Sequence, residues 1–299
     1  VFDQTLTGMG SRKLREWVLS PSKSHSEIVS RQDFVESLVK DSASRNEIRE
    51  LLAKVRDLQR ISVRVQTGRA SPRDILAIRD GLEVIPAIRS AIGRLDCDRA
   101  RHCLDSLFEL PELLDYLTKA LSDTPPAKVT DGGVIKEGFT AAIDELRSLS
   151  RDGKKWIADY AARERELTGI SSLKVRYTSA FGYFIEITSA NLAKVPSYYE
   201  RRQTLVGGER FITPELREYE SKVLSAESDL LEAESLEFSS IIQAVQSSFL
   251  QIGQIVEALA EIDTFCSFAK SAVDFGYVRP LVVEEPGIFL SEARHPVVE

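Results

Sequence analysis

Hydrophobic residues recur every three or four positions through most of the first 150 residues, which is the spacing of an amphipathic helix. In residues 11–22, for example, Leu14, Trp17 and Val18 fall on one helical face. The same spacing continues in the segments 31–39, 46–55, 70–82, 98–108 and 111–122. Residues 122–138 contain paired prolines and paired glycines, so a loop is predicted there. These patterns predict a helical body.

The hydrophobic period changes from helical to alternating after Gly169, a suitable C-terminal glycine for a long helix that begins near Phe139. In residues 172–177 the apolar side chains alternate with Lys174 and Arg176. Further short strands are predicted at residues 183–188, 201–205 and 209–212. We therefore predict a small antiparallel β module between two helical regions.

A second long helix is predicted to leave the β module at Thr213, because threonine is a favourable N-cap and Pro214 suits the first helical turn. Its apolar positions alternate in steps of three and four, as in a coiled-coil seam. The seam consists of Leu216, Tyr219, Val223, Ala226, Leu230 and Ala233. The predicted fold class is mainly α, with long antiparallel helices that carry a small inserted antiparallel β domain.

The last segment, residues 277–299, changes again to strand-like runs that contain Pro280 and Pro286. The pattern is unfinished at Glu299. We expect this segment to be the beginning of a further domain that is cut off.

The composition is that of an ordinary soluble protein, with 43% hydrophobic and 28% charged residues. No apolar run approaches the roughly 18 residues that a membrane helix needs, so no membrane partner is expected. Three cysteines are too few for a disulfide framework, and a reducing, cytoplasmic setting is predicted.

The net charge of −7 is unevenly distributed along the chain. Residues 154–213 contain ten Lys and Arg residues and six Asp and Glu residues, so this region carries +4 and the remainder carries −11. A basic tip on an acidic body predicts that a polyanion is contacted at the tip only.

Several motifs in this sequence resemble those of one family. The specific ones are TGISSLKVRYTSAFGYFIEIT at 168–188, RRQTLVGGERFITPELREYESKVL at 201–224 and ARHPVVE at 293–299. Together with DQTLTGMGSRKLREWVLSPS, GRASPRDILAIRD and DGGVIKEGF, they are similar to the MutS family of DNA mismatch repair proteins. The resemblance covers nearly the whole chain.

The resemblance implies a core or lever domain in two segments, residues 1–153 and 214–285. A clamp domain would be inserted between them at residues 154–213, in agreement with the β module. Residues 286–299 would begin a truncated ATPase domain.

The resemblance also implies a homodimer that closes around double-stranded DNA, grips its backbone and receives the ATP state through the levers. A MutL-type repair partner and a nucleoid-associated, cytoplasmic location are implied as well. ATP and Mg²⁺ would be bound by the full-length protein, because this sequence has no phosphate-cradling G-x-x-x-x-G-K-[ST] motif. The chain is therefore expected to be a fragment with no catalytic residue and no cofactor.

The family reads mismatches with a Phe-x-Glu motif in an N-terminal domain that this sequence lacks. Phe34-Val35-Glu36 falls in a predicted helix and Phe184-Ile185-Glu186 in a predicted clamp strand. We interpret both as chance matches.

Candidate metal and catalytic residues are few. Cys97, His102 and Cys103 lack the paired spacing and the fourth ligand of a structural zinc site, so no metal is predicted. His25 and His295 have no nucleophile and acid at a recognisable spacing, which leaves a hydrolase site unsupported. We interpret His295 as part of the junction with the ATPase domain.

The candidate DNA-backbone contacts carry guanidinium, ammonium, amide, hydroxyl or glycine N–H groups, which suit phosphate oxygens without base specificity. They are Arg201, Arg202, Gln203, Thr204, Arg176, Lys174, Lys194 and Gly207. The family usually reads TLxNAERF with a polar x, whereas this chain has Val206, Gly207 and Gly208, so one side-chain contact is lost. Glu209 and Arg210 are expected to pair within the clamp.

Two other functions stay open at this point. One is a helical scaffold arm with a protein-binding tip, which salt-dependent DNA binding at the tip would separate from the first hypothesis. The other is a MutS paralogue that acts on recombination junctions, which the N-terminal domain would decide.

Overall fold

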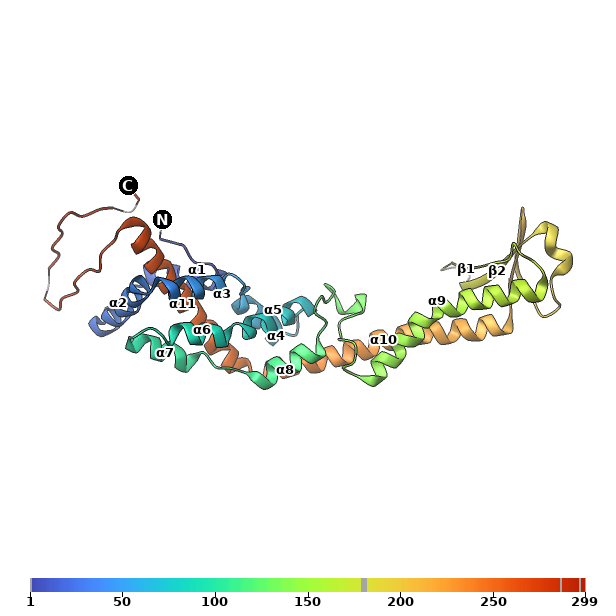
Figure 1. Cartoon of the computed structure of the whole chain (residues 1–299), viewed down its shortest axis with the longest axis horizontal. Coiled ribbons are helices and arrows are strands. Elements are labelled where there is room, and N and C mark those ends of the chain that lie inside the picture. The colour runs from blue at the N-terminus through green and yellow to red at the C-terminus, as the bar shows by residue number, and fades with distance from the viewer. Residues whose placement is uncertain (1, 179–181, 286, 296, 299) are drawn as a thin grey trace. The chain divides into compact units, whose positions relative to one another are not determined.

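The computed structural model describes residues 2–178, 182–285, 287–295 and 297–298. The chain forms two compact units, Val1–Lys128 with Ser239–Glu299 (unit 1) and Val129–Phe238 (unit 2). Both are mainly helical, and unit 2 carries a four-stranded antiparallel sheet (Figure 1). The predicted fold class is confirmed, whereas the boundaries between lever, clamp and ATPase segments stay predictions.

Unit 1 is built around one central helix, α11 (Phe249–Phe275), whose apolar residues are buried on nearly all sides. Helices packed directly on it are α1 (Gly8–Leu19), α2 (His25–Lys40), α3 (Ser42–Leu52), α4 (Leu58–Gln66) and α7 (Asp98–Ser106). The remaining helices of the unit are α5 (Pro72–Glu83), α6 (Ile85–Ile92) and α8 (Pro111–Ala120), with the end of α10 (Pro214–Ser247). A helix that is apolar all round is a core helix, which explains the position of α11.

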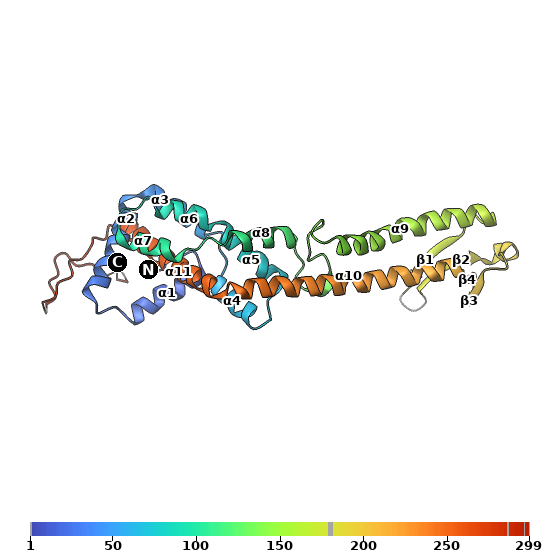
Figure 2. The ribbon, with the colours of Figure 1, turned by 90° about the horizontal axis from the view of Figure 1, so that it is seen from below.

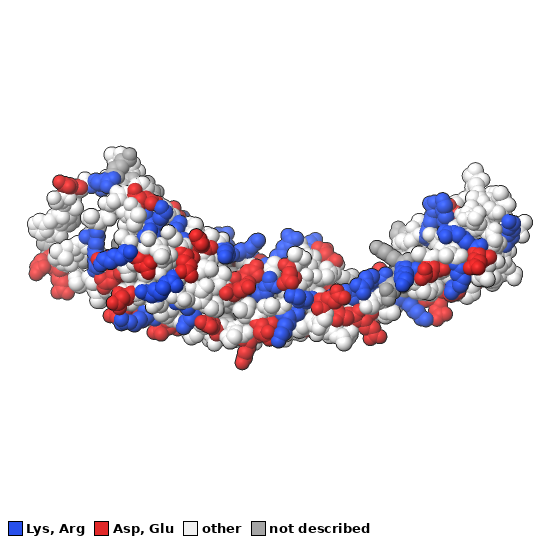
Figure 3. Space-filling view, in the orientation of Figure 1, with Lys and Arg blue, Asp and Glu red and all other residues white. Residues whose placement is uncertain are grey.

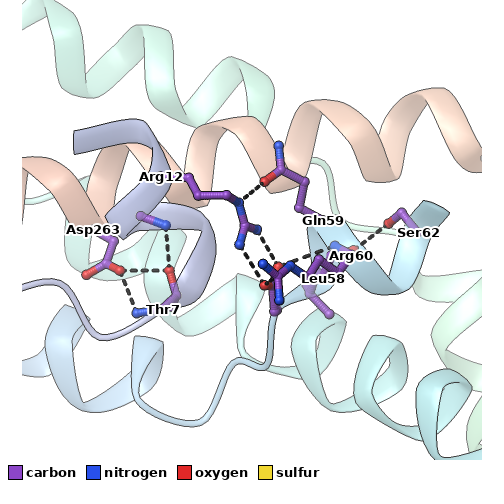
Figure 4. A network of polar contacts seen from close by, with 9 residues as sticks. Thr7, Arg12, Leu58, Gln59, Arg60, Ser62 and Asp263 are labelled. Atoms are coloured by element: carbon purple, nitrogen blue, oxygen red, sulfur yellow. Dashed lines mark hydrogen bonds and ion pairs between the residues drawn. The ribbon is translucent and has the colours of Figure 1, made fainter. Parts of the chain in front are cut away.

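A buried carboxylate fixes the start of α1 against α11 (Figure 4). Asp263 accepts hydrogen bonds from the backbone N–H groups of Leu6 and Thr7, at 3.0 and 2.8 Å, and from the Thr7 hydroxyl at 2.7 Å. A Cβ at Gly10 would overlap the Asp263 carboxylate, so glycine is required there. Burial raises the pKa of Asp263 even though these hydrogen bonds favour the charged form.

Unit 2 contains η1 (Val129–Asp131), α9 (Ala141–Thr168), the sheet and the first part of α10. The strands are β1 (Lys174–Thr178), β2 (Gly182–Thr188), β3 (Glu200–Leu205) and β4 (Gly208–Ile212), with η2 (Ser189–Lys194) between β2 and β3. Their order in the sheet is β1-β2-β4-β3. Gly169 ends α9 in the left-handed conformation, at φ +64°, as the sequence predicts.

Helices α9 and α10 run antiparallel within unit 2 (Figures 1 and 2). Trp156 of α9 stacks on Tyr219 of α10, with ring centroids 3.5 Å apart. Arg147, nearer the start of α9, pairs with Glu234, which lies further along α10, at 2.9 Å. Contacts that move backward along α9 as they move forward along α10 define an antiparallel pair, which confirms the prediction.

The loop before α9 is tied to both helices through Glu234, whose side chain is fully buried. The Glu234 carboxylate accepts hydrogen bonds from the N–H groups of Gly133 and Val134, at 2.7 and 3.2 Å, in addition to the Arg147 guanidinium. Arg147 also donates to the carbonyl of Ile135 at 3.0 Å. The buried Glu234 carboxylate thus connects the loop, α9 and α10.

One sequence prediction is wrong for the described residues. Residues 277–285, 287–295 and 297–298 form no strand, although the sequence alternates there. A strand requires a neighbouring strand to satisfy its backbone groups, and none lies beside this segment in the described part of the chain. Its apolar side chains are largely exposed, as at Ile288, Phe289 and Leu290.

Candidate nucleic-acid interface

The strand register assigns the side chains of the sheet to two faces, because directly paired residues project to the same side. Val175 pairs with Ile185, and Ile185 pairs with Phe211. These residues, with Ile187, pack on Tyr160 of α9 and Leu216 of α10, and they form the inner face. The opposite side of the sheet is called the outer face below.

Lys174, Arg176 and Gln203 share the outer face with Glu186 and Arg210. Lys174 pairs with Glu186, Glu186 with Arg210, and Arg210 with Gln203. Three of the eight candidate residues are therefore brought together, and they cross the sheet from β1 to β3. Lys174 and Arg176 are exposed, whereas Gln203 is half-buried.

Glu186 lies among the cations of the outer face. Its carboxylate oxygens are 3.9 Å from Arg176 Nε and 3.9 Å from Arg210 Nε. Arg210 also donates a hydrogen bond to Gln203 Oε1 at 2.8 Å, and its guanidinium lies 4.3 Å from the centre of the Phe184 ring. Arg210 is thus held within the sheet, and the Gln203 amide oxygen is occupied by it.

The edge strand β3 carries the remaining arginine candidates, but in a different arrangement. A register shift lies between Arg201 and Gln203, and Arg202 occupies the extra position with no partner on β4. Arg201 and Thr204 project toward the side of Phe211 and Glu209, and Arg201 Nη1 lies 3.6 Å from Glu209 Oε1. The bulge therefore separates Arg201 and Thr204 from the outer face.

Glu209 and Arg210 each form an ion pair within the sheet, with different partners. Both residues do form contacts inside the sheet, but neighbouring residues of one strand point to opposite faces. Glu209 consequently pairs with Arg201, and Arg210 lies beside Glu186.

The turn between β3 and β4 consists of Val206 and Gly207, both exposed. The Gly207 carbonyl accepts a hydrogen bond from the N–H of Ser189 at 3.1 Å. A Cβ at Gly207 would meet no atom within 4 Å, whereas a Cβ at Gly208 would overlap the carbonyl oxygen of Ile187. Glycine is therefore required at Gly208 and not at Gly207.

Lys194, like Gly207, is a candidate outside the strands. It ends η2, whose residues Leu192 and nearby Val195 pack on the inner-face cluster. The Lys194 side chain is exposed. It is therefore separate from the outer-face group of Lys174, Arg176 and Gln203.

The cations around the strands differ in how far they are neutralised. Within the described residues, Lys174, Lys194 and Arg202 have no ion pair or side-chain hydrogen bond, whereas Arg176 and Arg201 each face a carboxylate. Figure 3 shows Lys and Arg side chains interspersed with Asp and Glu side chains in this part of the chain. The unpaired cations are the ones whose charge is fully open to an anion.

Glu186 is the residue that the sequence reasoning did not consider for this face. The signal was present, because a register that pairs Thr178 with Gly182 also pairs Lys174 with Glu186. The bulge at Arg202 had no comparable signal, since it depends on how β3 meets β4.

The two Phe-x-Glu matches lie where the sequence predicts them, in α2 and in β2. The Phe34 and Phe184 side chains are 0% and 1% exposed, so neither ring can stack on a base. This agrees with their interpretation as chance matches.

The described residues contain no cluster of side chains that could form a metal site. No three His, Cys, Asp or Glu side chains come together there in a group that could hold a metal. Cys103 is buried, and burial raises the pKa of its thiol to about 12, while His102 is exposed. In that same part of the chain, no helix combines the length and the apolar character needed to cross a bilayer.

Comparison with known proteins identifies the family. A family model described as MutS domain III matches residues 1–269. The chain is 43% identical over 299 residues to the DNA mismatch repair protein MutS of Desulforamulus reducens and to that of Solibacter usitatus. It is 42% identical over 299 residues to the same protein of Symbiobacterium thermophilum. Each alignment covers 100% of this chain and 34% of the relative.

The chain belongs to the MutS family of DNA mismatch repair proteins. It spans about a third of the length of the curated relatives that it matches.

Proposed function

We propose that this chain is the lever and clamp region of a MutS-type protein and that its sheet binds the phosphate backbone of double-stranded DNA without base specificity. The observation that carries the proposal is the pair of unpaired cations, Lys174 on β1 and Arg202 on β3, at the two edges of one small sheet. Arg176 and Gln203 lie on the same two edge strands, β1 and β3 respectively, and belong to the outer face.

The dimensions of the sheet support this proposal. Strands are spaced about 4.8 Å apart, so the outer two of four strands lie roughly 14 Å apart. The major groove of B-DNA is about 12 Å wide between its two phosphate strands. Cations at the two edges of the sheet can therefore approach phosphates on both sides of a groove, while the polar groups between them contact no particular base.

The whole-protein functions are part of the same proposal. The parent protein would act as a homodimer, with ATP and Mg²⁺ bound outside this chain and with a MutL-type partner, in the cytoplasm near the nucleoid. The chain itself would couple the ATP state to DNA clamping and would bind no nucleotide, because it lacks a phosphate-cradling motif. A helical scaffold arm with a protein-binding tip is the competing function that the following experiment tests.

The test measures binding of a fluorescein-labelled 30-base-pair duplex by anisotropy over a range of salt concentrations. Log affinity falls by about 0.9 per neutralised phosphate for each unit of log salt, so three or four contacts give a slope of roughly −3 to −4. The variant Lys174→Glu/Arg202→Glu breaks no intramolecular ion pair among the described residues, and it should weaken binding by about tenfold or more. Its slope should become shallower by about two.

The matched control is Lys23→Glu/Lys128→Glu in unit 1, which changes the net charge equally at exposed positions. This control should bind with an affinity within about twofold of the unaltered chain. Equal loss in both variants would reduce the proposal to a net-charge effect. A duplex affinity that is unaffected by Lys174→Glu/Arg202→Glu would favour the scaffold function instead.

A further inference from the structure

A second concentration of cations lies in unit 1, on α4 and the segments that flank it. Residues 54–73 contain six Lys and Arg residues and one acidic residue, Asp57, a net charge of +5 in 20 residues. We call the exposed surface formed by Lys54, Arg56, Arg60, Arg64, Arg69 and Arg73 the α4 basic surface. This surface is not apparent from the net charge of −11 outside residues 154–213, because acidic residues elsewhere in that region outnumber its cations.

Most of these cations are open to solvent. Lys54, Arg56 and Arg69 are exposed and have no ion pair or side-chain hydrogen bond within the described residues. Arg60 is 73% exposed and lies 3.6 Å from Asp57 Oδ2. Only Arg64 is firmly paired, through two contacts of 3.1 and 2.5 Å with Asp74.

The two carboxylates closest in sequence to this surface already have structural tasks. Asp57 caps α4 by accepting from the N–H of Arg60 at 3.3 Å, and it binds the Arg12 guanidinium at 2.6 Å. Asp74 forms a capping box with Ser71 at the start of α5. Their negative charge is therefore balanced by helix N-termini and by individual guanidinium groups.

Helix α5, which packs on α4, carries two further acids, Asp80 and Glu83, and Asp80 pairs with Arg79 at 3.0 Å. Helix α4 packs on α5 and α11, and Gln246 of α10 donates to the Val65 carbonyl at 2.9 Å. The stretch of α10 and α11 from residue 239 to 256 contains no Asp or Glu. On the side of residues 239–256, therefore, no carboxylate offsets the charge of these cations.

The cations form a row along the exposed side of α4, because Leu58, Ile61 and Val65 occupy its buried side. Arg60 and Arg64 are four residues apart, or about 6 Å along the helix. Arg69 follows directly, since its N–H bonds the Arg64 carbonyl at 2.8 Å where the helix ends. The nine residues of α4 cover about 13 Å, which corresponds to about four phosphates of one DNA strand.

We propose that the α4 basic surface is a second binding surface for the phosphate backbone of duplex DNA, separate from the sheet. Five of its six cations are arginines, which bind phosphate in a bidentate manner that lysine cannot reproduce. The exposed amides of Gln59 and Gln66 lie between them along α4 and add neutral donors of the kind that contact phosphate oxygens. The surface is independent of the sheet, so either one can bind DNA if the other does not.

The test uses the whole chain and the variant Arg56→Glu/Arg60→Glu/Arg69→Glu. Duplex affinity should fall by about tenfold or more, and the salt slope should become shallower by about 2.7, which is 0.9 for each of three lost contacts. The matched control Lys23→Glu/Arg101→Glu/Lys128→Glu carries the same charge change on exposed residues of unit 1 and should keep the original slope. Because Arg60 contacts Asp57, the neutral variant Arg56→Gln/Arg60→Gln/Arg69→Gln provides the same readout if the Glu variant does not fold.

Combining variants distinguishes the two surfaces. In the Lys174→Glu/Arg202→Glu background, residual DNA binding should persist and should disappear when the three α4 arginines are also changed. An unchanged affinity and slope in the α4 variants would overturn this inference and leave the sheet proposal intact. Loss of binding to a polyglutamate peptide without loss of duplex binding would also overturn it, because the surface would then recognise an acidic protein.

Discussion

The hydroxyl groups of Tyr160 and Thr213 lie 2.6 Å apart where β4 ends and α10 begins. Thr213 Oγ1 also accepts a hydrogen bond from the N–H of Leu216 at 3.1 Å. Both side chains are buried, with exposed fractions of 1% and 2%. The Thr213 side chain thus caps α10 and also connects it to α9. These two hydrogen bonds hold the junction between β4 and α10 in place.

We expect Thr213→Val to lower the free energy of unfolding of unit 2 by about 2–3 kcal/mol. The substitution keeps the shape of the side chain but removes the cap and leaves the buried Tyr160 hydroxyl unpaired. Urea denaturation followed by Trp156 fluorescence in a Trp17→Phe background measures this quantity. Thr204→Val on exposed β3 is the control, and equal stability of the two variants would contradict the role of the junction.

We expect Glu186→Gln to raise the affinity for duplex DNA by about threefold or more, because it removes a negative charge from among the outer-face cations. Salt-dependent anisotropy measures the change. Glu166→Gln removes the same charge from an exposed position on α9 and should have little effect. An affinity that does not rise would show that DNA does not approach the outer face.

The glycines of the β3–β4 turn should respond differently to substitution. Gly207→Lys should fold normally and should steepen the salt slope by about 0.9, because a side chain there projects into open space. Gly208→Ala should destabilise unit 2 by about 1–3 kcal/mol, because its Cβ would overlap the Ile187 carbonyl oxygen. Thermal unfolding of both variants tests these two expectations. Similar melting temperatures for Gly207→Lys and Gly208→Ala would contradict the difference expected between the two glycines.

Acid should destabilise unit 1 partly through Asp57. The hydrogen bonds from Arg12 hold the pKa of Asp57 below its ordinary value of 3.8. Below pH 3.8 the folded state binds fewer protons than the unfolded chain, so the stabilisation is complete above that pH and is lost as the pH falls through the lowered pKa.

We therefore expect the stability of Asp57→Asn to depend less steeply on pH below about pH 4 than that of the unaltered chain. Urea denaturation followed by Trp17 fluorescence in a Trp156→Phe background provides the measurement. The exposed residue Asp105, changed to Asn, is the control and should leave the pH dependence unaltered. The same slope in Asp57→Asn and the control would refute the assignment.

Removal of the Glu234 carboxylate should be among the most damaging single changes in unit 2. Glu234→Ala leaves Arg147 and two backbone N–H groups without their buried acceptor, and we expect a loss of about 3–5 kcal/mol. Hydrogen exchange at Gly133 and Val134 should accelerate strongly. Glu232→Ala, at an exposed position of α10, should change neither quantity, and protected loop amides in Glu234→Ala would contradict the anchor.

Local chemistry made the junctions of the fold predictable. Gly169 and Thr213 act through their own backbone preferences or hydrogen bonds, and the structure places both where the sequence indicates. The four strands follow from alternation alone, because a small sheet packed on one face requires it.

Features that depend on a distant partner were not predictable in the same way. The bulge at Arg202 arises from the match between β3 and β4, and it places Gln203, and not Arg201, on the outer face. The alternating segment after residue 276 lacks a pairing strand in the described residues. Its alternation therefore predicted strands that the structure does not form there. For the α4 basic surface, averaging charge over a large region concealed a short cationic segment.

The edge positions of β1 and β3 have a consequence for solubility. An edge strand offers unpaired backbone groups to any other extended chain, and charged side chains are a common protection against such aggregation. Lys174 and Arg176 on β1, and Arg201 and Arg202 on β3, supply that protection on both edges. Apolar replacements at these positions would therefore favour self-association, whereas acidic replacements would keep the chains apart.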